Sequence, residues 1–254
     1  MVLKFLDTLI VMIVSAYFRI PSKKSHEFYM ENIKRFLRNV STPIVFFTTP
    51  DFVDELANMR PIEYPITFST YESIYEIEAF KKYGFSFWKH HSDLDGGPTR
   101  GNLTSPELAA IWYNKKEFIL RAYEITQSDE QYIWCDAGCI RTDAWLPYIR
   151  NFGTKLDVGD KLAFQLLREL PSTPQLLTWP SLNIAGAIIA GRIESWKTCG
   201  ALYDEILKKY DEKNIPAASD QYVWGSTITF WSDSFLTIKP VYSPDEWFFF
   251  LKMM

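Results

Sequence analysis

The first sixty residues alternate short apolar runs with amphipathic stretches, and this alternation restricts the fold more than any other feature of the chain. Residues 9–16 are rich in β-branched side chains and predict a buried strand. Residues 25–37 predict a helix capped by Ser25, residues 44–48 a second buried strand, and residues 51–59 a short helix. Strand, helix, strand, helix is typical of a parallel sheet with crossover helices. We therefore expect an α/β fold with a mixed, mostly parallel sheet flanked by helices.

The remaining sequence contains the same two kinds of element in a less regular order. Ser105 and Pro106 provide a cap and a first position for a long helix that ends near residue 126. The polar residues 90–105 predict a loop in front of it. Further predicted helices span residues 71–83, 161–170, 194–209 and 219–224, predicted strands span residues 66–68, 132–135 and 183–191, and an extended aromatic tail spans residues 235–254.

Composition limits the class of protein. The 254 residues are 47% hydrophobic and 17% aromatic, which is enough for a sizeable core, and no repeat or linker divides them. We therefore expect residues 1–254 to form a single domain. The net charge of −4 does not provide the basic footprint of a nucleic-acid-binding protein, so we expect no nucleic-acid partner. Cys135 and Cys139 have no nearby histidine, which predicts reduced thiols rather than zinc ligands.

An apolar run near the N-terminus, residues 9–18, bears on location. Its ten residues are fewer than the roughly 20 that a membrane-spanning helix needs. Lys4 in front of the run leaves a signal peptide open, whereas the β-branched residues favour a buried strand. We expect the strand, no transmembrane span, and a cytoplasmic protein whose sequons at Asn39 and Asn102 stay unmodified.

The segment QYIWCDAGCIR, residues 131–141, carries the strongest functional signal. A short apolar strand runs directly into Asp136, and Gly138 follows two residues later. A carboxylate at the end of a buried strand needs a partner, usually a metal ion, a cation or helix-terminal amides. Gly138 allows a ligand or another backbone to approach closely. The alternative is an N-capping Asp in a strand-to-helix turn.

Two other predicted strands end in residues that suit a ligand site. Ser15, Ala16 and Tyr17 follow the first strand, and Thr48 ends the second. Parallel sheets bind ligands beyond the carboxyl ends of their strands, so these ends and Asp136 would form one pocket if the strands are neighbours. There Tyr17 would stack on a base. Ordinary turn chemistry is the alternative for each residue taken singly.

Two lysines and one aspartate lie on predicted helices that border such a pocket. Lys115 and Lys116 precede the central strand, and a lysine facing the pocket would bind a diphosphate, with a solvated helix face as the alternative. Helical spacing does not separate the two lysines. Asp220 begins a later helix and is a candidate general base for an acceptor hydroxyl, with helix capping as the alternative.

The polar stretch also contains a literal Asp-x-Asp pattern. Asp93 and Asp95 lie beside His90 and His91, and such clusters can bind metals. No predicted strand flanks the pattern to hold it rigid. We therefore interpret the stretch as a solvated or substrate-covering loop rather than a metal site.

Several stretches together resemble a known family. They read IVMIVSAYFRIPSKKSHEFYMENIKRFL from residue 10, TPIVFFTTPDFVDELANMR from residue 42, NLTSPELAAIWYNKKEFILRA from residue 102, YIWCDAGCIR from residue 132, NIAGAIIAGRIESW from residue 183 and ASDQYVW from residue 218. Over residues 8–235 the chain resembles the HtrL/YibB-type family of bacterial and viral proteins. That family is regarded as similar to GT-A-fold nucleotide-diphospho-sugar glycosyltransferases.

The resemblance implies a single GT-A-like domain with a nucleotide-binding half, residues 8–141, and an acceptor-side half, residues 142–254. The family's WxDxG-like strand end falls on Trp134, Asp136 and Gly138, and its Asn-x-Lys motif falls on Asn114 and Lys116. The predicted nucleotide-sugar-binding residues are Ser15, Ala16, Tyr17, Thr48, Arg60, Asn114, Lys115, Lys116, Trp134, Asp136, Ala137 and Gly138. The predicted acceptor-binding residues are Asn183, Ala185, Gly186 and Gln221, with Asp220 and Asp136 as the catalytic pair.

The expected cofactor departs from the GT-A pattern. GT-A enzymes normally bind their metal with an Asp-x-Asp motif, and here Gly138 stands at the second carboxylate position. We therefore expect Asp136 to be the one protein ligand of a Mn²⁺ or Mg²⁺ ion, with the diphosphate of the donor and water completing its shell.

The resemblance implies a glycosyltransferase that moves a sugar from a nucleotide-diphosphate sugar to a glycan or other hydroxyl acceptor, in a bacterial or virus-infected host cytoplasm. The reaction inverts configuration if Asp220 is the base, and a retaining route is the alternative. The missing second Asp leaves open a catalytically silent sugar-nucleotide or glycan-binding protein, and a nucleotide-sugar hydrolase is a third reading. The aromatic residues 247–250 predict either a patch for peripheral membrane or partner contact, or packing against the domain.

Overall fold

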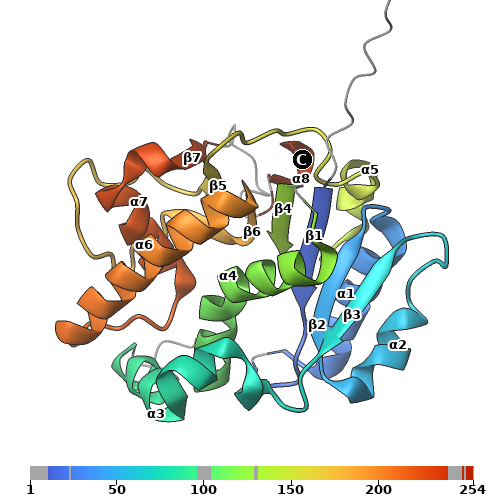
Figure 1. Cartoon of the computed structure of the whole chain (residues 1–254), viewed down its shortest axis with the longest axis horizontal. Coiled ribbons are helices and arrows are strands. Elements are labelled where there is room, and N and C mark those ends of the chain that lie inside the picture. Colours follow the sequence, from blue (N-terminus) through green and yellow to red (C-terminus); the bar gives the residue numbers. More distant parts are fainter. Residues whose placement is uncertain are drawn as a thin grey trace, which may run out of the picture.

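A seven-stranded mixed sheet forms the centre of the structure (Figure 1). The structure is a computed structural model and describes residues 11–22, 24–95, 104–128, 131–239, 248 and 250–253. The strands are β1 (Val11–Ala16), β2 (Ile44–Thr48), β3 (Ile66–Thr70), β4 (Gln131–Cys135), β5 (Leu162–Leu166), β6 (Ile184–Arg192) and β7 (Phe235–Ile238). Their order is β3-β2-β1-β4-β6-β5-β7, and β6 runs antiparallel to both of its neighbours while the other pairings are parallel. The predicted mixed, mostly parallel α/β sheet is confirmed.

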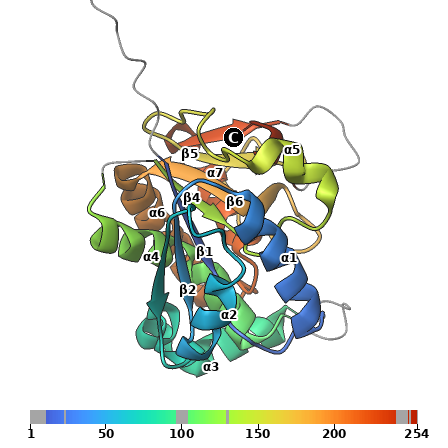
Figure 2. The same ribbon diagram turned by 90° about the vertical axis from the view of Figure 1, so that its right-hand side faces the viewer.

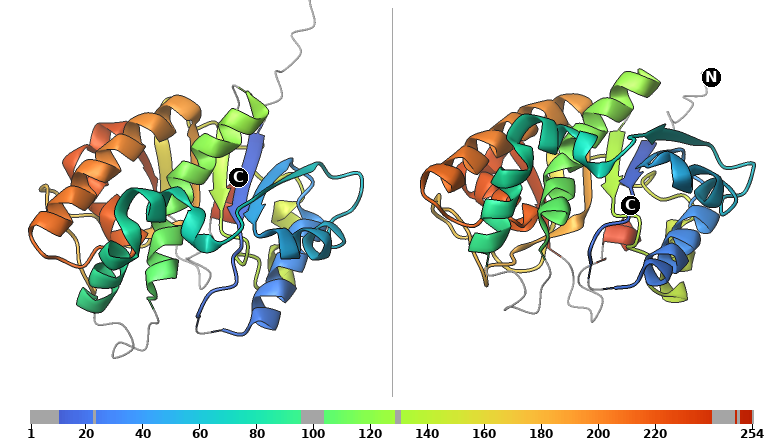
Figure 3. Two further views of the ribbon diagram at one scale, coloured as in Figure 1. Left: turned by 60° about the horizontal axis from the view of Figure 1, so that its bottom comes forward. Right: turned by 90° about the horizontal axis from the view of Figure 1, so that it is seen from below.

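Helices cover both faces of this sheet (Figure 2). They are α1 (His26–Asn39), α2 (Val53–Ala57), α3 (Glu78–Leu94), α4 (Pro106–Thr126), α5 (Leu146–Ile149), α6 (Ile193–Glu212), α7 (Asp220–Phe230) and α8 (Phe250–Met253). Short 3-10 helices span Pro50–Phe52, Ile74–Glu76, Asp143–Trp145 and Ser232–Ser234. One face packs on α3, α4, α6 and α7, and the other on α1, α2, α5 and α8. In Figure 3, α6 and α7 lie at one end of the molecule, and α1 and α2 lie at the other. Helices α3 and α4 lie between these two pairs.

Helix α4 packs across the sheet against β1 and β4 and carries Lys115. Ser105 caps it by accepting a hydrogen bond from the Leu108 amide at 3.2 Å, and Pro106 stands in its first turn, as predicted. The Phe118 ring of α4 stacks on Phe47 of β2 at 4.7 Å and on Trp134 of β4 at 5.8 Å between ring centroids. This aromatic packing holds the buried face of α4 against β2 and β4.

Three sequence-based assignments of helix or loop are wrong. Residues 161–170, predicted as a helix, contain the strand β5, whose five residues are all buried between β6 and β7. A short apolar run fits a buried strand and a buried helix equally well by periodicity, and only its neighbours decide. The helix expected over residues 71–83 begins at Glu78 and runs through a kink at Gly84 (φ 77°) to Leu94. The polar residues 90–94 are therefore helical rather than part of a loop.

The C-terminal tail is not extended throughout. Residues 235–238 form the edge strand β7, and Phe250 is buried in α8 against the core that includes Trp145. Trp247 and Phe249 lie outside the described residues, so of the predicted aromatic patch the structure describes Phe248 and Phe250. Among the described residues, no helix has both the length and the apolar character needed to cross a membrane.

Candidate functional site

A pocket of about 630 Å³ lies at the carboxyl ends of β1 and β4. Its walls come from the segments that follow these two strands, from α4, and from the beginnings of β6 and α7. Pockets for small ligands usually measure about 300–1,000 Å³ and lie beyond the carboxyl ends of parallel strands. Size and position therefore both mark this pocket as the candidate functional site.

A buried lysine forms the polar centre of the pocket wall. Lys115 is 1% exposed, and its ammonium lies 2.7 Å from the Gly186 carbonyl oxygen, 2.7 Å from Asp220 Oδ2 and 3.2 Å from Asp136 Oδ1. The contact with Asp220 is an ion pair whose angle falls outside hydrogen-bond geometry. Three oxygens from three separate segments thus surround one cation, and α4, β4, β6 and α7 meet at this point.

Gly186 allows Asp220 to come this close. A Cβ atom at position 186 would lie 2.9 Å from Asp220 Oδ2, well inside normal contact distance. Strand β6 and the first turn of α7 therefore need a residue without a side chain at this position. Gln221, the next residue on α7, fixes the same junction because its side-chain amide donates to the Ile184 carbonyl oxygen.

Asp136 presents its carboxylate to the pocket. Its amide donates to the Ala187 carbonyl oxygen at 2.8 Å, and its Oδ1 accepts a hydrogen bond from the Trp134 indole at 2.7 Å. The side chain is still 37% exposed, whereas that of Asp220 is 4% exposed. The carboxylate pairs with Lys115 and Trp134 and is followed by a turn, so the alternative of a helix-capping Asp does not describe it.

The environment of the cluster shifts two of its pKa values. Burial raises the pKa of Asp220 above its ordinary range, and Lys115 opposes this shift. Burial lowers the pKa of Lys115, but Asp136 and Asp220 outweigh burial, and the net direction is upward. The lysine therefore stays charged, and Asp220 is a stronger base than an ordinary aspartate.

Tyr17 lines the pocket at the end of β1. Its hydroxyl and His26 Nδ1 lie 2.6 Å apart, and its ring packs edge-on against Phe52 at 5.6 Å. Burial raises the pKa of Tyr17 to about 12, so the phenol stays neutral. The ring is held rigidly enough to serve as a flat surface for a ligand.

The structure brings most of the predicted residues to this pocket. Those that line it are Ala16, Tyr17, Lys115, Trp134, Asp136, Ala137, Gly138, Gly186, Asp220 and Gln221. The predicted residues outside its lining are Ser15, Thr48, Arg60, Asn114, Lys116, Asn183 and Ala185.

Arg60 and Lys116 lie apart from the pocket for clear physical reasons. Arg60 donates to the carbonyl oxygens of Val40, Thr42 and Pro65 and so ties loops at the amino ends of β2 and β3, opposite the pocket. Lys116 pairs with Glu117 and with Asp204 of α6, and its ammonium lies 4.3 Å from the centre of the Tyr113 ring. Both cations hold secondary structure elements together.

The other five predicted residues outside the lining either form hydrogen bonds within the fold or are buried in the sheet. Asn114 accepts a hydrogen bond from the Ala79 amide at 2.9 Å, Ser15 donates to the Cys135 carbonyl oxygen at 2.7 Å, and Asn183 donates to the Glu169 carbonyl oxygen at 2.6 Å. Thr48 is buried at the end of β2, and Ala185 pairs with β5 inside the sheet. Correct placement on a strand end was therefore not enough to place a side chain in the pocket.

Basic residues that the sequence did not single out line the same pocket. Arg19, Lys24 and Arg141 are exposed side chains on the segments that follow β1 and β4. His26 of α1 and Trp112 of α4 also line the pocket. Their position in the sequence could have identified the three basic residues, since they lie just beyond the predicted strand ends. We call Arg19, Lys24 and Arg141 the basic rim, in contrast to the acidic floor formed by Asp136 and Asp220.

The Asp-x-Asp pattern lies at the end of α3, away from the pocket lining. Asp93 is exposed and pairs with Lys89 at 2.7 Å, and Asp95 accepts a hydrogen bond from the Thr104 hydroxyl at 3.4 Å. His91 is buried, 3.5 Å from Asp211. The remainder of the predicted loop, residues 96–103, lies outside the described residues.

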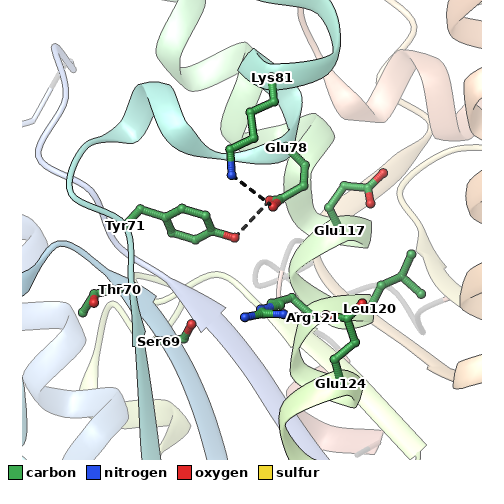
Figure 4. Close-up of a pocket in the computed structure, with 9 residues that line it drawn as sticks. All are labelled: Ser69, Thr70, Tyr71, Glu78, Lys81, Glu117, Leu120, Arg121 and Glu124. Atoms are coloured by element: carbon green, nitrogen blue, oxygen red, sulfur yellow. Dashed lines mark hydrogen bonds and ion pairs between the residues drawn. The ribbon is translucent and has the colours of Figure 1, made fainter.

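A second pocket of about 420 Å³ lies between β3, α3 and α4 (Figure 4). Tyr71 and Lys81 point toward Glu78, at 3.0 Å and 3.8 Å, and on α4 Arg121 pairs with Glu124 at 2.6 Å. Its charged groups thus pair with one another, and both Lys81 and Arg121 are largely exposed. This pocket is the weaker candidate.

A Mn²⁺ or Mg²⁺ ion held by both Asp136 and Asp220 does not fit the carboxylates as they stand, because the Lys115 ammonium lies between them. The described parts of the chain contain no group of three or more His, Cys, Asp and Glu side chains that could hold a metal ion. A metal on Asp136 therefore stays a prediction.

Neither models of known protein families nor curated proteins give a match to this chain. The resemblance to the HtrL/YibB-type family likewise stays a prediction. Functional conclusions depend on the geometry of the pocket.

Proposed function

We propose that the protein is a glycosyltransferase with a GT-A-like fold, which moves a sugar from a nucleotide-diphosphate sugar to a glycan or other hydroxyl acceptor. The cluster of Lys115, Asp136 and Asp220 in a pocket beyond the carboxyl ends of β1 and β4 is the observation that carries the proposal. Buried charged side chains such as Lys115 and Asp220 are costly for a fold, and their clustering with Asp136 in a ligand-sized pocket favours a functional role.

The two charged regions of the pocket match the two parts of such a donor. The basic rim provides positive charge for a diphosphate in a protein whose net charge is −4. Trp112 and Tyr17 offer flat surfaces for the base or for the apolar face of the sugar. The exposed Asp136 carboxylate accepts hydrogen bonds from sugar hydroxyls.

The transfer needs a base near the acceptor. The acceptor oxygen forms a bond to the anomeric carbon, the bond from that carbon to the phosphate oxygen breaks, and the nucleoside diphosphate leaves with the electron pair. The proton of the acceptor hydroxyl goes to a carboxylate, for which the raised pKa of Asp220 is suited. One displacement of this kind inverts the configuration. Asp136, the more exposed carboxylate, contacts the substrate, and Lys115 positions both carboxylates.

Thermal-shift binding of a panel of nucleotide sugars, with and without Mn²⁺, tests this proposal. The wild type is compared with Asp136→Ala and with the control variant Asp93→Ala. Asp93 is an exposed carboxylate of the Asp-x-Asp pattern and lies outside the pocket lining. We expect one donor class to stabilise the wild type and Asp93→Ala and to lose its effect in Asp136→Ala. Absence of any nucleotide-induced shift in the wild type would refute the transferase proposal.

A catalytically silent sugar-nucleotide-binding protein is the second candidate. It is favoured by the pairing of both carboxylates with the Lys115 ammonium, which opposes the rise in the pKa of Asp220. A binding protein retains the donor-induced thermal shift but releases no nucleoside diphosphate when acceptors are added. A hydrolase, the remaining reading, releases free sugar at the same rate with and without an acceptor.

A further inference from the structure

The oxygens around Lys115 form the kind of shell that a divalent cation prefers. They are the Gly186 carbonyl oxygen and one carboxylate oxygen each from Asp136 and Asp220, at 2.7, 3.2 and 2.7 Å from the ammonium. Carbonyl and carboxylate oxygens are the typical ligands of Mg²⁺ and Mn²⁺. The Lys115 side chain thus brings a positive charge to the position where such an ion would lie.

Asp220 shows that this position needs a cation. Its carboxylate is 4% exposed, and its Oδ2 has no aligned hydrogen bond among the described residues, so the Lys115 ammonium is its compensating charge. The missing side chain of Gly186 leaves the carboxylate in contact with β6. A metal ion bound to the same oxygens would lie next to the ammonium, and the two positive charges would repel each other.

We propose that the Lys115 ammonium is the resident cation of this site and takes the place of a divalent metal. The wild-type protein accordingly binds no Mn²⁺ at the Asp136–Asp220 pair and needs none for its ligand. Removal of the lysine turns the Gly186 carbonyl oxygen and the two carboxylates into a Mn²⁺ site. The statement about the ligand rests on the proposed function, whereas the statement about Mn²⁺ stands on the geometry alone.

The neighbouring lysine supplies a matched control. Lys116 lies one residue later on α4 and is also buried, but its partners Glu117 and Asp204 have side chains that are 20% and 27% exposed. It lies outside the pocket lining, so Lys116→Ala removes a buried lysine without touching the oxygens around Lys115.

Mn²⁺ binding is measured by calorimetry and by the melting temperature in the wild type, Lys115→Ala and Lys116→Ala. We expect a saturable Mn²⁺-induced stabilisation in Lys115→Ala and in neither of the others. The further change Asp220→Asn in the Lys115→Ala background should abolish it. Saturable Mn²⁺ binding by the wild type that is lost in Asp136→Ala would overturn the proposal, as would absence of binding in a folded Lys115→Ala protein.

Two further outcomes are also decisive. If Lys115→Ala folds only with Mn²⁺ and unfolds when EDTA is added, the proposal is supported, because the metal then replaces the missing charge. If it folds under neither condition, wild-type Mn²⁺ calorimetry decides: saturable binding that is lost in Asp136→Ala overturns the proposal, and absence of such binding supports it.

The ligand part is tested with nucleoside diphosphates on the wild type in excess EDTA and in Mn²⁺. We expect the dissociation constant to change by less than about threefold, and a loss of more than about tenfold in EDTA would refute metal-independent binding. If no nucleoside diphosphate binds under either condition, the proposed function fails while the Mn²⁺ experiment on Lys115→Ala keeps its meaning.

Discussion

Replacing Lys115 with methionine is the most informative single change, because it removes a buried cation and preserves most of the side-chain volume. Asp220 would be left 4% exposed without its partner, facing Asp136 with a like charge. Removing one partner of a buried ion pair typically costs about 3–5 kcal/mol of unfolding free energy. In a protein of this size, about 1 kcal/mol lowers the melting temperature by about 2–4 °C, so we expect a loss of about 6–20 °C.

The assay is urea unfolding of the wild type, Lys115→Met and Lys116→Met at neutral pH. Because Glu117 and Asp204 reach solvent, Lys116→Met should cost only about 1 kcal/mol. Adding Asp220→Asn to Lys115→Met removes the uncompensated charge and should recover about 2 kcal/mol. Equal costs for the two lysine variants, or no recovery in the double variant, would refute the assignment of Lys115 as the charge that compensates Asp220.

Three further predictions concern packing, pH and thiol reactivity. Gly186→Ala should cost about 1–3 kcal/mol of stability and weaken ligand binding, because its Cβ would lie 2.9 Å from Asp220 Oδ2. Gly138→Ala, whose Cβ would have its nearest neighbour at 3.5 Å, should melt like the wild type. The pKa of Lys115 is raised above 10.5 in the folded state, so its stabilisation is present below that pH and is lost as the pH rises through the folded value. Melting temperatures of the wild type and Lys115→Met should therefore converge in strong alkali, and a constant difference would contradict this. Burial raises the pKa of the Cys199 thiol to about 12. An aromatic disulfide reagent should therefore label Cys199 at pH 8 only after the protein unfolds. Rapid labelling of the native protein would disprove the burial of this thiol.

Local signals predicted most elements of the fold. Ser25 and Ser105 are side-chain caps of α1 and α4, and the β-branched or aromatic runs of β1, β2 and β4 became buried strands. These signals depend on residues close in the chain, which is why they can be read from sequence. Strand β5 was missed because a five-residue apolar run has no periodicity of its own, and its identity comes from pairing with β6 and β7.

The location of the pocket was also predictable in outline. The rule that ligands bind beyond the carboxyl ends of parallel strands brought Tyr17, Asp136 and Gly138 to the correct edge of the sheet. The same rule would have included Arg19 and Arg141, which lie on the same segments.

The sequence by itself determined that this chain forms a mostly parallel α/β sheet with a carboxylate at the end of a central strand. Only the tertiary structure decided that Lys115, and not Lys116, meets that carboxylate together with Asp220. The two lysines are adjacent on one helix, and their spacing to apolar neighbours does not separate them. Lys115 lies on the side of α4 that packs on β4 and β6, and Lys116 lies on the side that packs on α6. These contacts join residues about a hundred positions apart, so they depend on how the elements pack and not on any local pattern.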